Sequence, residues 1–144
     1  MGMPVDRDAW LTLRLVPEIG RMRFHRLVEA FGNPQTVLRA GVKALQRVPG
    51  MDIVAAENVT RHADLVDLAR EKELVELNEA RIITLFDDEY PLNLRHSFLP
   101  PPMIYVRGEL EKADRFAIAV VGSRMSTTYG RTATDAIVQD LVKA

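Results

Sequence analysis

The sequence predicts an α+β protein, in which an all-α first part is followed by the start of an α/β second part. From residue 9 to about residue 60, apolar residues recur at helical spacing between tight turns. After residue 80 the pattern changes to short runs rich in β-branched residues, which are typical of strands. The last run leads through a glycine into one more helical stretch. We place the boundary between the two domains at residue 72, so that they comprise residues 1–72 and 73–144.

Helices in the first part are predicted from apolar stripes and from their end signals. Residues 9–15 form the first helix. In the second helix, Phe24, Leu27, Val28 and Phe31 follow the spacing i, i+3, i+4, i+7, and Gly32 closes the helix. Asn33 followed by Pro34 predicts a capped start of the third, which ends at Gly41. A short helix over residues 42–48 and a longer one over residues 61–78 complete the series.

Two similar turns separate these helices. Val16-Pro-Glu-Ile-Gly20 and Val48-Pro-Gly-Met51 start 32 residues apart, and each follows a short apolar helix. This arrangement resembles the helix-hairpin-helix module, whose turns offer backbone N–H groups to a DNA phosphate. Glu18 and Asp52 depart from the module's pattern, because each places an acid where a glycine is usual. The alternative is that both are packing turns of a small helical bundle, and we favour it.

The second part contains three runs that predict strands, over residues 81–86, 103–107 and 116–121. Three consecutive prolines at residues 100–102 predict an extended connector before the second strand. A helix is expected over residues 129–143, packed on one face of a parallel sheet. Further βα units are needed to cover the other face of the third strand. The sequence is therefore expected to be the N-terminal piece of a longer protein, or to require a partner chain.

The most informative local feature is Gly122-Ser123-Arg124, directly after the third predicted strand. A glycine turn between a strand and a helix brings backbone N–H groups and the helix N-terminus together, which favours an anion. A serine hydroxyl and an arginine guanidinium suit a phosphate. Ser126 and Thr127 extend this polar segment. The alternative is an ordinary tight turn with a solvated arginine, because no G-x-G-x-x-G or P-loop pattern is present.

Charge is distributed unevenly along the chain, although the net charge is −1. Residues 14–47 carry seven Arg and Lys against two Glu, and residues 57–90 carry ten acids against four bases. This asymmetry indicates a basic surface for polyanions on the first part. The alternative is that charged helix faces only keep the protein in solution. The residues expected to form an auxiliary basic face are Arg21, Arg23, Arg26, Lys43 and Arg47.

Composition excludes several kinds of chemistry. The absence of cysteine rules out disulfides and thiol catalysis and is consistent with a reducing cytoplasm, where we expect the protein to reside. No run reaches the roughly 18–20 apolar residues of a membrane span, so no membrane partner is expected. His25, His62 and His96 lack metal spacing, and His25 is expected at the surface. Residues 87–89 are read as a solvated acidic loop rather than a cation site, and no catalytic residue, cofactor or metal is predicted.

Three motifs in order resemble one family. They are Asp88-x-Tyr-Pro-x-x-Leu94, Pro101-Pro-x-Ile-Tyr-x-Arg-Gly-x-Leu110 and Ala119-Val-Val-Gly-Ser-Arg-x-x-Thr-x-Tyr-Gly130. Together with the helical first part, they resemble the bacterial DNA-processing protein A (Smf) family. The resemblance implies a SAM-like helical domain and an extended Rossmann-like domain. It also implies single-stranded DNA and the RecA recombinase as partners, a homodimer in the complete protein, a role in natural transformation, and phosphate binding at Gly122, Ser123 and Arg124.

Two rival functions remain open at this point. One is a Rossmann-like nucleotide-binding enzyme of the nucleoside-monophosphate phosphoribohydrolase type, which also places a Gly-Ser turn after a strand. The other is an interaction module whose acidic residues 57–90 contact a basic partner. The basic helical first part favours the DNA-binding interpretation, because a small-nucleotide enzyme does not need it.

Overall fold

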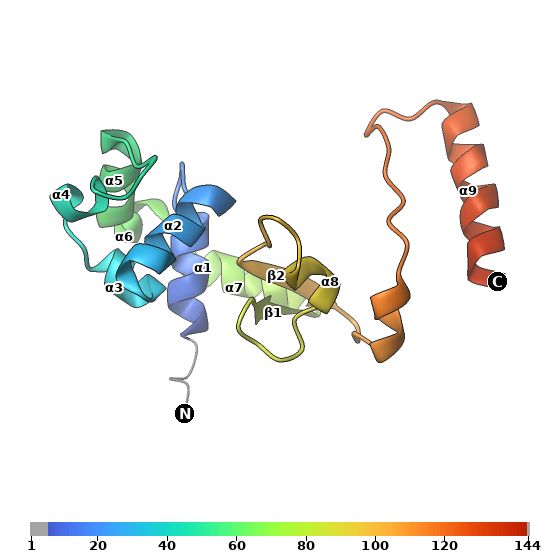
Figure 1. Ribbon diagram of the computed structural model, residues 1–144, viewed down its shortest axis with the longest axis horizontal. Helices are drawn as coiled ribbons and strands as arrows, with labels where there is room; N and C mark the ends of the chain where they lie inside the picture. Colours follow the sequence, from blue (N-terminus) through green and yellow to red (C-terminus); the bar gives the residue numbers. More distant parts are fainter. Residues whose placement is uncertain (1–5, 144) are drawn as a thin grey trace.

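The first part of the protein is a bundle of short helices around one apolar core (Figure 1). We describe residues 6–143 of a computed structural model. The first five helices are α1 (Arg7–Leu15), α2 (Arg21–Phe31), α3 (Pro34–Leu38), α4 (Val42–Leu45) and α5 (Ile53–Thr60). Their core is closed by the fully buried side chains of Leu13, Phe24, Leu27, Val37, Leu45 and Val59.

Local signals fix two of these helix ends as the sequence predicts, whereas α3 ends at Leu38 instead of Gly41 and α4 ends at Leu45 instead of residue 48. Gly32 has a φ of 86°, a left-handed conformation that glycine adopts without strain, and its N–H closes α2 on the carbonyl of Val28. Asn33 accepts a 2.9 Å hydrogen bond from the N–H of Thr36, and Pro34 occupies the first turn of α3. The predicted end of α2 and the predicted start of α3 are thus confirmed.

The long helix predicted over residues 61–78 is wrong, because the chain breaks there into α6 (His62–Leu65) and α7 (Leu68–Leu77). Val66 is extended between them, and the Asp67 carboxylate accepts a 2.9 Å hydrogen bond from the N–H of Arg70. Asp67 therefore starts a new helix instead of continuing the old one. We call residues 6–66 the helical module. The boundary expected at residue 72 falls inside α7, which packs on the following strand.

A two-stranded antiparallel sheet follows, made of β1 (Ala80–Thr84) and β2 (Met103–Arg107). Its register pairs Ala80 with Arg107 and Thr84 with Met103. The long connection between the strands contains α8 (Leu92–Arg95). Ile83, Tyr90 and Val106 form a second, smaller core that is separate from the core of the helical module. The first two predicted strands exist, but the predicted parallel arrangement does not apply to them.

The third predicted strand, over residues 116–121, is wrong. A short 3₁₀-helix η1 (Lys112–Phe116) is followed by an extended segment without strand pairing up to residue 127. Phe116 and Val121 are 72% and 90% exposed. A β-branched run becomes a strand only beside a hydrogen-bonding neighbour. Among the described residues, β1 and β2 pair with each other and no strand pairs with this run.

The last helix, α9 (Thr128–Lys143), matches the helix predicted over residues 129–143. It stands apart from the β1–β2 sheet, joined to it only by the extended segment (Figure 1). Ile137 and Leu141, which were expected to pack on the sheet, are 58% and 42% exposed. The expected packing of this helix is therefore also wrong.

Candidate nucleic-acid interface

The Gly122-Ser123-Arg124 segment lies fully on the surface. All residues from 117 to 129 are exposed, so the backbone and the Arg124 guanidinium are accessible to a large ligand. Gly122 has open space around the position of an added Cβ, and its φ is not left-handed. No hydrogen-bonded turn forms at Gly122 in place of the predicted tight glycine turn, and the chain instead bends at Arg124 and Met125.

Ser123 and Thr127 organise the approach to α9. The Ser123 hydroxyl accepts a 3.2 Å hydrogen bond from the N–H of Met125. The Thr127 hydroxyl accepts a 3.1 Å hydrogen bond from the N–H of Gly130 and so caps the helix. Ser126 lies between them and is exposed. The five predicted phosphate-binding residues thus lie within one exposed stretch of six, interrupted only by Met125, that ends at a helix N-terminus.

The residues expected to form the auxiliary basic face divide into two groups. Arg21, Lys43 and Arg47 are exposed and make no salt bridge within residues 6–143. Arg23 and Arg26 are half-buried and bind the backbone of the second turn. The first group is available to a polyanion, whereas the second is occupied by contacts inside the module.

Arg23 joins the two turns that the sequence analysis singled out. Its guanidinium donates to the carbonyl of Glu18 at 2.9 Å, to the carbonyl of Gly50 at 2.9 Å and to the carboxylate of Asp52 at 2.6 Å. The N–H of Ala55 also donates to Asp52, at 2.8 Å. These two donors lower the pKa of Asp52, the backbone N–H contributing most. The arginine therefore serves the packing of the turns, as the favoured bundle interpretation expects.

Both turns have the same backbone geometry. The N–H of Ile19 bonds to the carbonyl of Val16 at 3.2 Å, and the N–H of Met51 bonds to the carbonyl of Val48 at 3.1 Å. Glu18 has a φ of 69° and Gly50 a φ of 80° at the third position of each turn. These are the features of a type II turn, which requires a positive φ at that position. Glu18 is thus a non-glycine residue in a conformation that favours glycine.

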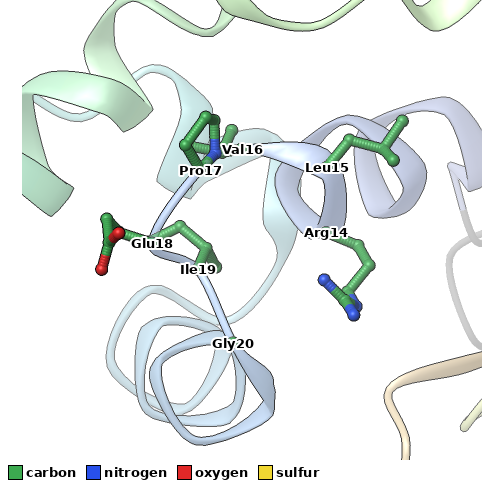
Figure 2. A pocket seen from close by; sticks show the side chains of 7 residues that line it. All are labelled: Arg14, Leu15, Val16, Pro17, Glu18, Ile19 and Gly20. Carbon is green, nitrogen blue, oxygen red and sulfur yellow. The ribbon is translucent and has the colours of Figure 1, made fainter.

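An open hollow of about 520 Å³ lies at the first turn, lined by residues 14–20 (Figure 2). The side chains of Arg14 and Glu18 extend to opposite sides of this turn (Figure 2). Glu18 is also within 3.6 Å of the Arg23 guanidinium. One cation and one anion therefore flank the hollow, so its edge has no excess of positive charge for a phosphate.

The acids of residues 57–90 are mostly engaged. Five of them form salt bridges, with Arg7, Arg61, Arg70, Arg81 and Arg107 as their partners. Glu71 accepts a 2.6 Å hydrogen bond from the Tyr105 hydroxyl, and burial together with this carboxylate raises the pKa of that tyrosine. Half of the ten acids in this stretch thus have a salt-bridge partner within the molecule, whereas Arg21, Lys43 and Arg47 have none among the described residues.

Sequence reasoning missed a set of contacts that join the two parts. His25, expected at the surface, is half-buried, and its Nε2 lies 2.7 Å from the carbonyl oxygen of Pro100. Asp87, assigned to a solvated loop, binds Arg7 at 2.8 Å. Such contacts connect residues about 75–80 positions apart and have no periodic signal. No group of three metal-ligating side chains occurs within residues 6–143.

The fold and this surface define a class: a helical module joined to a small sheet, followed by an exposed Gly-Ser-Arg segment that leads into a helix. Residues 81–144 match the family described as DNA recombination-mediator protein A. The resemblance inferred from the three motifs is therefore confirmed over that part of the chain, which contains the whole Gly-Ser-Arg segment. No curated protein and no solved structure matches the chain. In the described part, no helix has the length and apolarity to cross a membrane.

Proposed function

We propose that this protein binds single-stranded DNA through the polar stretch from Gly122 to Thr127. The observation that carries the proposal is the complete exposure of this stretch within the family-matched residues 81–144. An exposed guanidinium close to a helix N-terminus suits a backbone phosphate, which carries no sequence information. The role that follows is recombination mediation, in which the bound strand is passed to RecA.

The helical module contributes less to binding in this proposal. Arg21, Lys43 and Arg47 add an electrostatic attraction that depends strongly on salt, without fixing the position of the strand. A homodimer, also implied by the resemblance, doubles the number of such stretches that one strand meets. We assign no catalytic step to the protein, which acts as a cytoplasmic binding protein without a cofactor.

The experiment compares Arg124→Ala with Arg107→Ala in titrations of a labelled single strand at several salt concentrations. Arg107 is a matched control, because it is exposed on β2 and pairs only with Glu79 at 3.7 Å. We expect Arg124→Ala to weaken binding by roughly 1.5–3 kcal/mol, the range for a hydrogen bond to a charged group. The slope of log affinity against log salt should flatten by roughly 0.7.

Arg107→Ala should leave both the affinity and the salt slope unchanged. Equal affinity and slope for wild type and Arg124→Ala would remove Arg124 from the interface. Release of free base from a nucleoside monophosphate would instead favour the rival phosphoribohydrolase function. RecA delivery is tested separately, by comparing the rate of RecA assembly on a single strand with wild type and with Arg124→Ala.

A further inference from the structure

The helical module and the sheet meet at one aromatic contact. The Trp10 ring in α1 lies 5.5 Å from the Phe86 ring, edge to face, in the loop that follows β1. On its other side Trp10 packs against Phe24 in the module, with ring centroids 5.1 Å apart. Trp10 is 5% exposed, whereas Phe86 is 64% exposed. The loop residue therefore covers an edge of a tryptophan that otherwise belongs to the module.

An ion pair at Asp87, the residue after Phe86, joins the same two parts of the molecule. The Arg7 guanidinium donates to Asp87 Oδ1 at 2.8 Å. Asp87 Oδ2 accepts from the N–H and the hydroxyl of Thr84 at 2.7 and 2.9 Å. The carbonyl of Asp87 accepts from Arg95 Nη2 at 2.7 Å. The sheet side of the pair is thus rigidly held, while Arg7 is half exposed and held mainly by its charge.

Two further polar contacts cross this junction. Lys72 in α7 pairs with Asp8 in α1 at 2.9 Å, and His25 meets the Pro100 carbonyl. The two apolar cores share no residue. Interfaces within one chain that contain several polar contacts allow relative motion of the parts.

We propose that Arg7, Trp10, Phe86 and Asp87 form a salt-sensitive latch between the helical module and the sheet. When the latch is closed, the module has one orientation relative to the β1–β2 sheet. The Arg7 side of the pair is half exposed, although Asp87 is mostly buried, so salt screens the pair from the Arg7 side; the Debye length falls to about 3 Å at about 1 M salt. Weakening of the Arg7–Asp87 pair lets Phe86 leave Trp10, and the indole edge becomes hydrated. The module then turns at the break between α6 and α7.

Trp10 reports on the latch directly, because it is the only tryptophan in the chain. The experiment records the emission maximum of wild type, Arg7→Gln and Arg70→Gln at low salt and at about 1 M salt. Arg70 is the matched control: its side chain is about as exposed as that of Arg7, and its 2.6 Å pair with Glu73 lies within α7, away from the junction. Far-UV circular dichroism of each variant checks that the helices are intact.

We expect salt to shift the wild-type emission to the red. Arg7→Gln should be red-shifted already at low salt and insensitive to further salt, while Arg70→Gln should behave as wild type. The proposal is overturned if Arg7→Gln emits as wild type does, or if Arg70→Gln shifts equally. Should Arg7→Gln lose helical signal, Asp87→Asn opens the latch from outside the module. An unshifted emission in that variant also overturns the proposal.

Discussion

Arg23 and Asp52 lie 29 residues apart in sequence and are joined by a 2.6 Å hydrogen-bonded ion pair that holds the two turns of the helical module together. The same guanidinium binds the backbone of both turns, through the carbonyls of Glu18 and Gly50. A single side chain thus fixes the relative position of two structurally equivalent turns. The stability of the module should depend on it more than on any exposed arginine nearby.

We predict that Arg23→Gln lowers the free energy of unfolding by about 1–3 kcal/mol, because backbone carbonyls and a carboxylate lose a charged donor. Urea denaturation measures this loss. Arg47→Gln is the control, and its effect should stay within about 0.5 kcal/mol, since Arg47 is exposed and makes no salt bridge among the described residues. Equal effects of the two substitutions would contradict the proposed role of Arg23.

The first turn should gain stability from Glu18→Gly. A non-glycine residue with a φ of 69° carries conformational strain of roughly 1–3 kcal/mol, and glycine removes most of it. The lost contact with Arg23 is small, because Glu18 is largely exposed and 3.6 Å away. We expect the thermal midpoint to rise, as measured by circular dichroism. A lower midpoint would show that the Glu18 carboxylate contributes more than its geometry indicates.

In the second turn, Gly50→Ala should lower the stability of the module, whereas Glu18→Gly in the first turn should raise it. Gly50 has a φ of 80°, and an added Cβ would lie 2.5 Å from Arg26 Nη1. Strain and displacement of Arg26 should together destabilise the module by about 1–3 kcal/mol. Urea denaturation of Gly50→Ala and Glu18→Gly side by side tests whether the turns share one geometry. If both substitutions change the free energy of unfolding in the same direction, the two turns do not share one geometry.

Acid should destabilise the module through Asp52. Its pKa is lowered from 3.8 in the folded state, first by the Ala55 N–H and also by Arg23. A group with a depressed folded pKa contributes stability above its unfolded pKa, and this contribution is lost as pH falls through the folded pKa. Stability should therefore decline as pH drops below about 4, and Asp52→Asn should show a shallower decline. Denaturation midpoints measured at intervals of pH give the slope of stability against pH for wild type and for Asp52→Asn. Identical slopes would show that Asp52 does not cause the acid destabilisation.

The exposed segment after β2 should promote self-association. Phe116, Ile118 and Val121 are each at least two-thirds exposed, and Ile137 and Val142 on α9 are more than half exposed. Apolar surface of this extent tends to associate, and an extended β-branched segment readily pairs with a second copy. Light scattering at increasing concentration should show a rising mass, which Ile118→Asp reduces. A constant monomer mass for wild type would refute this prediction.

Charge removal on the helical module should affect DNA binding less than Arg124→Ala does. Substituting Gln for Arg21, Lys43 and Arg47 together removes the exposed cations without touching the turn contacts of Arg23. We expect a weaker affinity, mainly at low salt, because these side chains act over distance. If this triple variant loses more affinity than Arg124→Ala, the helical module is the main DNA-binding surface.

Local signals in the sequence predict most of the helical module, because apolar spacing, the Asn33 cap and Gly32 act within a few residues. Prediction from the sequence fails where contacts with residues far away in the chain determine the structure. The run 116–121 has strand composition, but no described strand pairs with it, and the break at Val66 depends on Asp67 capping a new helix. For the candidate site, residue types could be predicted, whereas the burial of Arg23 and the Arg7–Asp87 contact could not, since they join segments far apart in sequence.

The separation of the two cores has a consequence for synthesis on the ribosome. Every buried residue of the larger core lies between Trp10 and Val59, so the module's apolar contacts are complete before β2 is translated. Strand β1, in contrast, waits for residues 103–107 before it has a partner. Because N-terminal units fold first during translation, α1 then presents a finished surface to the emerging loop. Phe86 and Asp87 thus dock late, onto a template that is already folded.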